Sequence, residues 1–249
     1  MGVDAQASRA AELDILRAAG VDLELVPLER GPIFDNRQTA AGRVQIAHQA
    51  SETMPTTAIP DAWRTSQTVL LGPVAAELTS DWATALAPDA FVALAWQGLL
   101  RELIPSRPVR RLALTRNPLV ARADALFVSA EDALPDASIH ELVGPAQRLF
   151  LTHGALGAVA LQVGNGRLHG RLIPPLPRRV PIDTTGTGDV FVAAWLAARS
   201  LAPATDGWRH LAIAAAAASI NVTARGLANV PDSQAVAEVL VRLRDRHFD

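Results

Sequence analysis

Apolar and polar positions recur with two different periods along this chain. Four short runs have mostly apolar centres, as expected for strands buried on both faces, at 68–72, 91–96, 123–129 and 148–154. Helical spacing follows two of these runs, at 73–86, where Pro73 would occupy the first turn, and at 130–144, which we expect to be helical or turning. Strands that alternate with helices predict one α/β domain spanning 1–249, with a mostly parallel sheet between two helical layers.

The two ends of the chain carry clearer helix signals. A helix over 7–20 would end at Gly20 as its C′ glycine, and three further helices are predicted at 187–200, 205–224 and, after an Asp232-Ser233 N-cap, 233–247. Residues 158–173 predict a hairpin that turns at 164–166. Strict alternation at 21–29 and 42–50 indicates strands with one exposed face, separated by turn formers at 30–43. We therefore expect a small β lid over about 21–48.

Composition narrows the class of protein. Hydrophobic residues make up 49%, yet no apolar run approaches the roughly 20 residues that span a membrane. The first 20 residues lack a basic region followed by an apolar region, as in a secretory signal, and there are no cysteines, so we expect a cytoplasmic protein without disulfides or thiolate metal sites. A formal charge of −2 gives no electrostatic reason to expect a nucleic acid or a membrane as partner.

The chain has no lysine, and all 23 basic residues are arginine. A Walker A loop needs its lysine, and a pyridoxal enzyme needs a Schiff-base lysine, so both are excluded. Tyrosine is absent as well, which removes any tyrosine general acid. Any phosphate chemistry must therefore rely on backbone amides, arginine and metal ions.

The stretch TTGTGDVF, at 184–191, places two glycines directly before an apolar helix. Amides at a helix N-terminus have no partner within the helix and attract anions, and Gly186 and Gly188 would allow close approach of a phosphate. The carboxylate of Asp189 would repel that phosphate, which favours proton chemistry or metal coordination there. Alternatively, Asp189 only favours the first helical turn, and the glycines only make a tight loop. A Rossmann site is disfavoured because its third glycine would fall on Phe191.

Several segments resemble the PfkB, or ribokinase-like, family of carbohydrate kinases. DTTGTGDVF resembles the family signature DTxGAGDxF, with Thr187 in place of alanine. LTHGALGA resembles the T-x-G-x-x-G nucleotide turn, and NVTARGLANVPD resembles the late loop over the adenine, with Gly226 and Pro231 in place. VLLGPVAAEL, ALAWQGLLR and FDNRQTAAGR resemble the middle of one bacterial branch, so the similarity covers nearly the whole chain.

This resemblance implies a ribokinase-like αβα sandwich that transfers the γ-phosphoryl group of Mg·ATP to a hydroxyl of a sugar, polyol or nucleoside. Asp189 would be the catalytic base, and the amides of Gly186, Thr187 and Gly188 would form the anion hole. Asp183 would brace the turn or help to bind a monovalent cation, as in some relatives. The residues implied to bind ATP are Thr152, Gly154, Gly157, Asp183, Thr185 and Gly226.

The chain departs from the family pattern in two internal places. The N-x-x-E segment appears as SAED, which puts Ser129 and Asp132 at the motif positions. Asp132, or the neighbouring Glu131, would then organise Mg²⁺ indirectly, whereas Ser129 reads equally well as an ordinary N-cap. Ala215 stands where the late helix often has asparagine.

The N-terminal segment departs as well. Residues 1–22 resemble the family's G-x-D segment, which follows a strand with a substrate-binding aspartate and a Gly-Gly pair, and no Gly-Gly pair occurs in this sequence. The expectation is a truncated chain, a different way of binding the acceptor, or loss of phosphorylation. Losing a central strand would leave unpaired sheet edges, so we expect a homodimer.

The acceptor residues are left open by the sequence. Asn36 and Arg37 on the lid, and Arg101 after Gln97-Gly98, are candidates for acceptor contacts, and a purely structural role fits them as well. The six histidines show no metal-ligand spacing. The rival to a kinase is a non-catalytic, nucleotide-binding relative with a structural or regulatory role.

Overall fold

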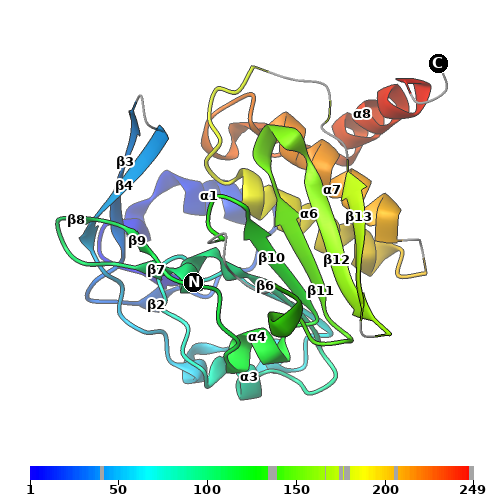
Figure 1. Ribbon diagram of the computed structural model, residues 1–249. Helices are drawn as coiled ribbons and strands as arrows, with labels where there is room; N and C mark the ends of the chain where they lie inside the picture. Colours follow the sequence, from blue (N-terminus) through cyan, green and yellow to red (C-terminus); the bar gives the residue numbers. More distant parts are fainter. Residues whose placement is uncertain are drawn as a thin grey trace.

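The computed structural model describes residues 1–39, 42–133, 139–165, 167–173, 176, 180–204 and 207–246. Within these residues the main sheet has six strands in the order β13-β12-β11-β10-β6-β5 (Figure 1). Strands β5, β6, β10 and β11 are parallel, while β12 and β13 form the antiparallel hairpin that the sequence predicts. The bounds are Thr68–Leu71 (β5), Phe91–Ala95 (β6), Ala125–Ser129 (β10), Arg148–Thr152 (β11), Ala158–Gly164 (β12) and Arg167–Ile173 (β13).

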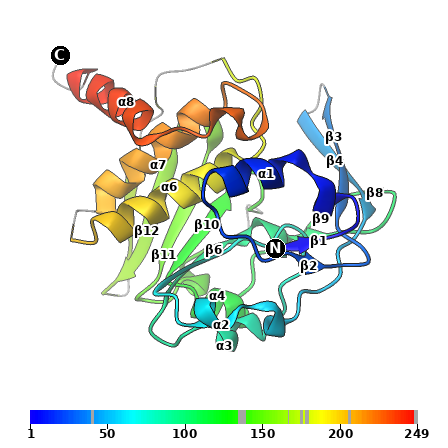
Figure 2. The ribbon, with the colours of Figure 1, turned by 180° about the vertical axis from the view of Figure 1, so that it is seen from behind.

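The sheet separates two hydrophobic cores because successive side chains of a strand point to opposite faces. Val92 and Leu94 of β6 join the core that contains helices α3 (Trp82–Ala85) and α4 (Pro118–Arg122). Ala93, between them, joins the core formed with α6 (Thr187–Leu201) and α7 (Gly207–Asn221). Figure 2 shows α6 and α7 lying across one side of the sheet. The predicted three-layer αβα arrangement is confirmed.

An aromatic cluster fixes helix α6 on the sheet. The rings of Phe127 and Phe150, on neighbouring strands, are stacked with centroids 4.6 Å apart. The fully buried indole of Trp195, from α6, lies 4.8 Å from the Phe150 ring and 5.4 Å from the Phe127 ring. Pairs of this kind are worth about 0.5–1.5 kcal/mol beyond their buried area. They hold the middle of α6 against β10 and β11.

The small sheet differs from the predicted lid. Strands β3 (Ile33–Thr39), β4 (Gly42–Gln49) and β8 (Arg107–Pro108) pair in that order and project from one side of the molecule (Figure 1). The strand predicted at 21–29 is wrong for most of its length, since only β2 (Val26–Pro27) pairs there, with β1 (Gly2–Val3). Residues 33–39, predicted as a turn, are a strand because β4 supplies their backbone partners.

The helix predicted at 73–86 is reduced to α3 at its end. The carboxylate of Glu77 instead accepts the amides of Val74 and Ala75, at 2.8 and 2.6 Å, and Ala76 has a φ of 59°. These contacts close a non-helical turn, so Pro73 does not begin a helix. Shorter elements nearby are η2 (Thr56–Ala58), α2 (Asp61–Arg64), η3 (Trp96–Leu100), β7 (Arg101–Glu102), β9 (Arg110–Arg111) and α5 (Ile139–Leu142).

The predicted terminal helices are present. η1 (Ala7–Arg9) and α1 (Ala11–Ala18) precede Gly20, whose φ is 79°. The amides of Gly20 and Val21 bond back to the carbonyls of Arg17 and Leu16, the pattern of a glycine C-cap. Helix α8 (Ser233–Arg246) is preceded by Asp232, whose carboxylate caps it by accepting the Ala235 amide at 2.8 Å. No helix in the described part of the chain is long and apolar enough to cross a membrane.

Candidate active site

The turn before α6 has a conformation that requires glycine. Gly186 is the N-cap residue, with φ 76° and ψ −4°, in the left-handed region that costs other residues about 1–2 kcal/mol. The carboxylate of Asp183 accepts the Thr185 amide at 2.9 Å, and the Thr187 amide makes a long bond of 3.3 Å to the Thr184 carbonyl. The chain therefore reverses sharply and enters the helix at Thr187.

The end of α7 holds this turn in place. The amides of Ile182 and Asp183 both donate to the Val222 carbonyl, at 2.7 and 3.2 Å. The Thr187 hydroxyl donates to the side-chain oxygen of Asn221 at 3.3 Å, and Asn221 is only 3% exposed. Sequence reasoning missed Asn221, because nothing local marks the last residue of an alanine-rich helix as the support of a distant turn.

Two amides of the first helical turn are open. The first bond of the α6 ladder runs from the Val190 amide to the Gly186 carbonyl, at 2.9 Å. The amides of Gly188 and Asp189 have no acceptor among the described residues, and a Cβ on Gly188 would meet no atom within 4 Å. The Gly186 amide has no acceptor among these residues either, so of the three predicted donors only the Thr187 amide is engaged in the turn. The open amides suit an anion approaching the helix N-terminus.

Asp189 lies beside these amides in an unusual electrostatic setting. The residue is exposed to solvent, yet the protein atoms packed around its carboxyl exclude enough water to raise the pKa of that group. The charge of Arg101 acts in the opposite direction and lowers that pKa. A carboxyl with a raised pKa accepts a proton more readily than an ordinary aspartate, as a general base must.

Arg101 and Asp132 form one network at the ends of β6 and β10. Asp132 Oδ1 lies 3.8 Å from the Arg101 guanidinium, and Oδ2 accepts the Gln97 side-chain amide at 2.7 Å. Both ionic side chains are largely buried, 9% and 13% exposed. Gln97 was not predicted; its place after a buried strand was the only signal. The Ser129 hydroxyl accepts the Glu131 amide at 3.0 Å and so shapes the turn that follows β10; residues 130–133 are not helical, so Ser129 caps no helix there.

The predicted donor turn follows β11. Gly154 and Gly157 have φ of 54° and 100°, and the His153 amide closes the loop on the Gly157 carbonyl at 2.8 Å. Thr152 accepts the Ala130 amide through its carbonyl at 2.8 Å, which ties this turn to the end of β10. Gly226 opens the short helix η5 (Gly226–Asn229) with a φ of 57°. All three glycines thus occupy conformations that other residues adopt only with strain.

The lid candidates are joined to the small sheet. Arg37 pairs with Asp35 at 2.5 Å, and Asn36 accepts the Gln45 side-chain amide at 2.7 Å. Both candidates are exposed. These contacts stabilise the hairpin between β3 and β4, and a role toward an acceptor stays a prediction.

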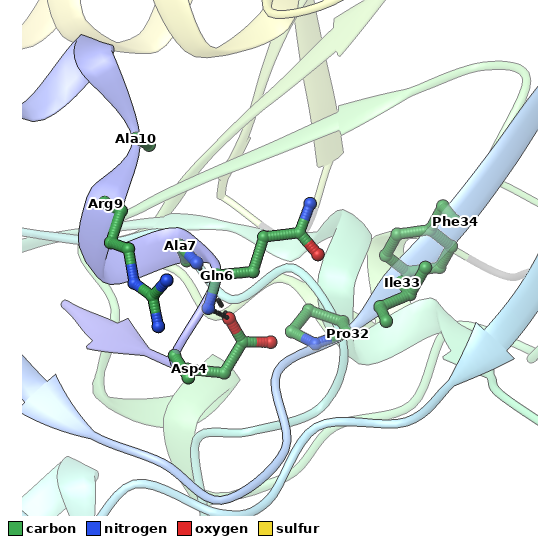
Figure 3. A pocket seen from close by; sticks show the side chains of 9 residues that line it. Asp4, Gln6, Ala7, Arg9, Ala10, Pro32, Ile33 and Phe34 are labelled. Carbon is green, nitrogen blue, oxygen red and sulfur yellow. Dashed lines mark hydrogen bonds between the residues drawn. The ribbon is translucent and has the colours of Figure 1, made fainter.

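A cavity of about 880 Å³ separates the N-terminal turn from β3 (Figure 3). Gln6 points from that turn toward Ile33 and Phe34, and Arg9 also lines the cavity. The Asp4 carboxylate is occupied by the amides of Gln6 and Ala7, at 2.9 and 2.8 Å. Asp4 therefore shapes the N-terminal turn.

The described residues contain no cluster of three or more histidine, aspartate or glutamate side chains able to hold a metal ion. Mg²⁺ commonly takes one or two carboxylates and completes its shell with water and substrate phosphates. Asp132 is already held by Arg101 and Gln97, while Glu131 is exposed. The residues present fit a magnesium ion carried by a nucleotide and reached through water.

Comparisons with known proteins agree with the motifs. Residues 119–234 match the profile described as pfkB family carbohydrate kinase. A pyrophosphate-dependent kinase of the ribokinase family, in a sulfate complex, superposes with a TM-score of 0.74 at 17% identity, over 96% of this chain and 84% of its own. Ribokinase from Giardia lamblia gives 0.70 at 16% identity, over 97% and 81%.

Ribokinase from Arabidopsis thaliana, complexed with ribose and ATP, gives a TM-score of 0.65 at 20% identity, over 96% of this chain and 80% of its own. No curated protein matches the sequence. The ribokinase-like fold and the resemblance to the PfkB family are thereby confirmed. At these identities the solved structures show the fold alone.

Proposed function

We propose that this chain, which has the ribokinase fold and matches the pfkB carbohydrate kinase family over residues 119–234, is an ATP-dependent small-molecule kinase. Its acceptor would be a hydroxyl of a sugar, polyol or nucleoside. The observation that carries the proposal is the start of α6, where the Asp189 carboxyl, with its raised pKa, adjoins the open amides of Gly188 and Asp189. A site that binds only phosphate gains nothing from a carboxylate there.

In this reaction the acceptor oxygen forms a bond to the γ-phosphorus, and the bond from that phosphorus to the β-bridging oxygen breaks. The acceptor proton passes to Asp189, a role worth about 10²–10⁴ in rate. Negative charge on the transferring group meets the open amides, each worth about 10²–10³ when it stabilises developing charge. The hydrogen bonds from this turn to Asn221 and Val222 would keep the open amides directed at the transferring group.

The chain has no lysine, and Arg101 supplies the positive charge near the base in its place. Phosphoryl transfer depends mainly on positioning and on neutralising charge, so an arginine near the base fits that need. Its guanidinium is anchored on Asp132, and its charge reaches Asp189. Mg²⁺, when bound with the nucleotide, would neutralise further phosphate charge, with Asp132 and Glu131 acting on it through water.

The donor would lie over the turn that follows β11 and beside η5. Thr152, Gly154, Gly157 and Gly226 would contact the nucleotide, and Asp183 and Thr185 would brace the phosphate turn or help to hold a monovalent cation. One structural neighbour is a pyrophosphate-dependent kinase, so pyrophosphate belongs in the test beside ATP. Association of two copies stays a prediction.

The test measures product release from Mg·ATP and from Mg·pyrophosphate across sugars, polyols and nucleosides. We expect turnover that depends on an acceptor and falls by about 10²–10⁴ in Asp189→Asn. ATP binding should persist in that variant, because the carboxyl acts on the acceptor. Donor binding without turnover of any acceptor would contradict the kinase and support a non-catalytic nucleotide-binding role.

A further inference from the structure

A two-stranded ribbon next to the proposed base aligns two arginines. Strands β7 and β9 are antiparallel, with Arg101 opposite Arg111 and Glu102 opposite Arg110. The Leu112 amide donates to the Leu100 carbonyl at 2.8 Å, which makes Arg101 and Arg111 a pair without mutual hydrogen bonds. The Cα atoms of such a pair lie about 4.5 Å apart, and their side chains leave the same face.

Charge is balanced on one face of the ribbon and unbalanced on the other. Glu102 and Arg110 form an ion pair on one face. On the other face Asp132 compensates Arg101, whereas Arg111 is exposed and takes part in no ion pair among the described residues. Like charges directly opposite each other are destabilising, so this face favours an added anion.

The position of the ribbon separates this anion from the donor phosphates. The proposed donor turn follows β11, Asp132 follows β10, and the ribbon follows β6, which is the next strand in the sheet. Neighbouring strands lie about 4.8 Å apart, so the end of β6, from which η3 leads to the ribbon, lies about 10 Å from the end of β11. The same segment continues into β8, which pairs with β4 of the small sheet. The ribbon therefore connects the residue whose charge acts on Asp189 to the small sheet, on which the predicted acceptor residues Asn36 and Arg37 lie.

We propose that Arg111 binds a carboxylate or phosphate group of the acceptor, so that the substrate is an anionic sugar or polyol, while Arg101 stays paired with Asp132 beside the transferring group. The guanidinium fork matches the paired oxygens of either group. The inference rests on the proposed kinase function, but it concerns binding and can be tested without turnover.

The experiment measures binding, by calorimetry without donor, of three- to six-carbon sugars and polyols, each compared with its phosphorylated and carboxylate counterparts. We expect at least one charged ligand to bind about 10- to 100-fold more tightly than its neutral counterpart, as charge-assisted hydrogen bonds allow. Arg111→Ala should abolish that preference, and Arg111→Lys should restore part of it. Arg110→Ala, on the opposite face, is the matched control and should keep the preference.

The phosphorylated and carboxylate arms identify which anion the site prefers. Equal weakening by Arg111→Ala and Arg110→Ala would refute the subsite, because general electrostatics would explain it. No preference for any charged ligand would refute it as well. Turnover of a neutral acceptor that is unchanged in Arg111→Ala would overturn this inference and leave the kinase intact, whereas anion binding without turnover would support the subsite and count against the kinase.

Discussion

The Arg101 guanidinium lies 3.8 Å from Asp132 and, at the same time, lowers the pKa of Asp189. One largely buried cation therefore links the end of β10 to the start of α6, two segments that are more than 50 residues apart in the sequence. Because of this link, a change of charge at residue 101 should have an effect that can be measured at Asp189.

Arg101→Gln should move the acidic limb of the pH–rate profile to higher pH. The arginine opposes the effect of burial on Asp189, so its loss raises the pKa of that carboxyl further, and the base becomes ionised only at higher pH. The measurement is kcat/KM against pH for the wild type and the variant. Arg110→Gln, whose partner is Glu102, is the control and should leave the limb unmoved. An unmoved limb in Arg101→Gln would show that the charge does not reach the base.

Asp189→Asn should be more stable than the wild type at pH 7 while losing activity. Because the pKa of Asp189 is raised in the folded state, folding favours its protonated form. The unfolding free energy therefore falls as pH rises from below the unfolded pKa, about 3.8, through the folded pKa. Thermal melts should give the variant a higher melting temperature than the wild type at pH 7, and the two melting temperatures should become equal below pH 4. A wild type that is the more stable protein at pH 7 would argue against burial as the cause.

Gly186→Ala should cost about 1–2 kcal/mol of unfolding free energy because the N-cap has a φ of 76°. Gly188→Ala is the matched control: it is helical, nothing lies within 4 Å of its added Cβ, and stability should be unchanged or higher by up to about 1 kcal/mol. Urea titrations of both variants measure the difference. Equal losses in the two variants would mean that the left-handed conformation of Gly186 is not required.

Gly98→Ala should destabilise the fold severely, by about 2 kcal/mol or more, as overpacking does. Its Cβ would lie 2.0 Å from the Pro73 carbonyl oxygen, a backbone atom that cannot move aside without shifting the turn at 73–77. Gly72→Ala, with no atom within 4 Å, should be nearly neutral. Chemical denaturation of the pair tests this; a tolerated Gly98→Ala would mean that the two loops pack more loosely than they do here.

Several elements could be predicted because short-range physics decides them. The apolar runs of β5, β6, β10 and β11 are too short for helices and too apolar for exposed strands, so a buried parallel sheet follows. Gly20 and Asp232 mark helix ends through local hydrogen bonds. The α6 turn could be predicted for the same reason, since glycines before a helix create an anion site whatever surrounds them.

Other elements depend on contacts between distant residues. Residues 33–39 contain the turn formers Asp35 and Asn36 at their centre, and pairing with β4 makes the segment a strand. Residues 73–79 have a helical pattern, but the Glu77 carboxylate accepts the amides of Val74 and Ala75, and the segment forms a turn in place of a helix. A side chain that competes for backbone donors leaves no trace in hydrophobic periodicity.

The sequence alone determined the four parallel strands, the β12–β13 hairpin and the terminal helices, the anion-binding turn with Asp189 beside it, and the resemblance to a kinase family, because each depends on neighbours within a few residues. Only the tertiary structure decided the rest: Asn221 supports the turn, Arg101 pairs with Asp132 and acts on Asp189, and Arg111 stands beside Arg101. These contacts join residues far apart in the chain. Charge and hydrogen bonding act through space, so their partners are settled only once the sheet has brought its strand ends together.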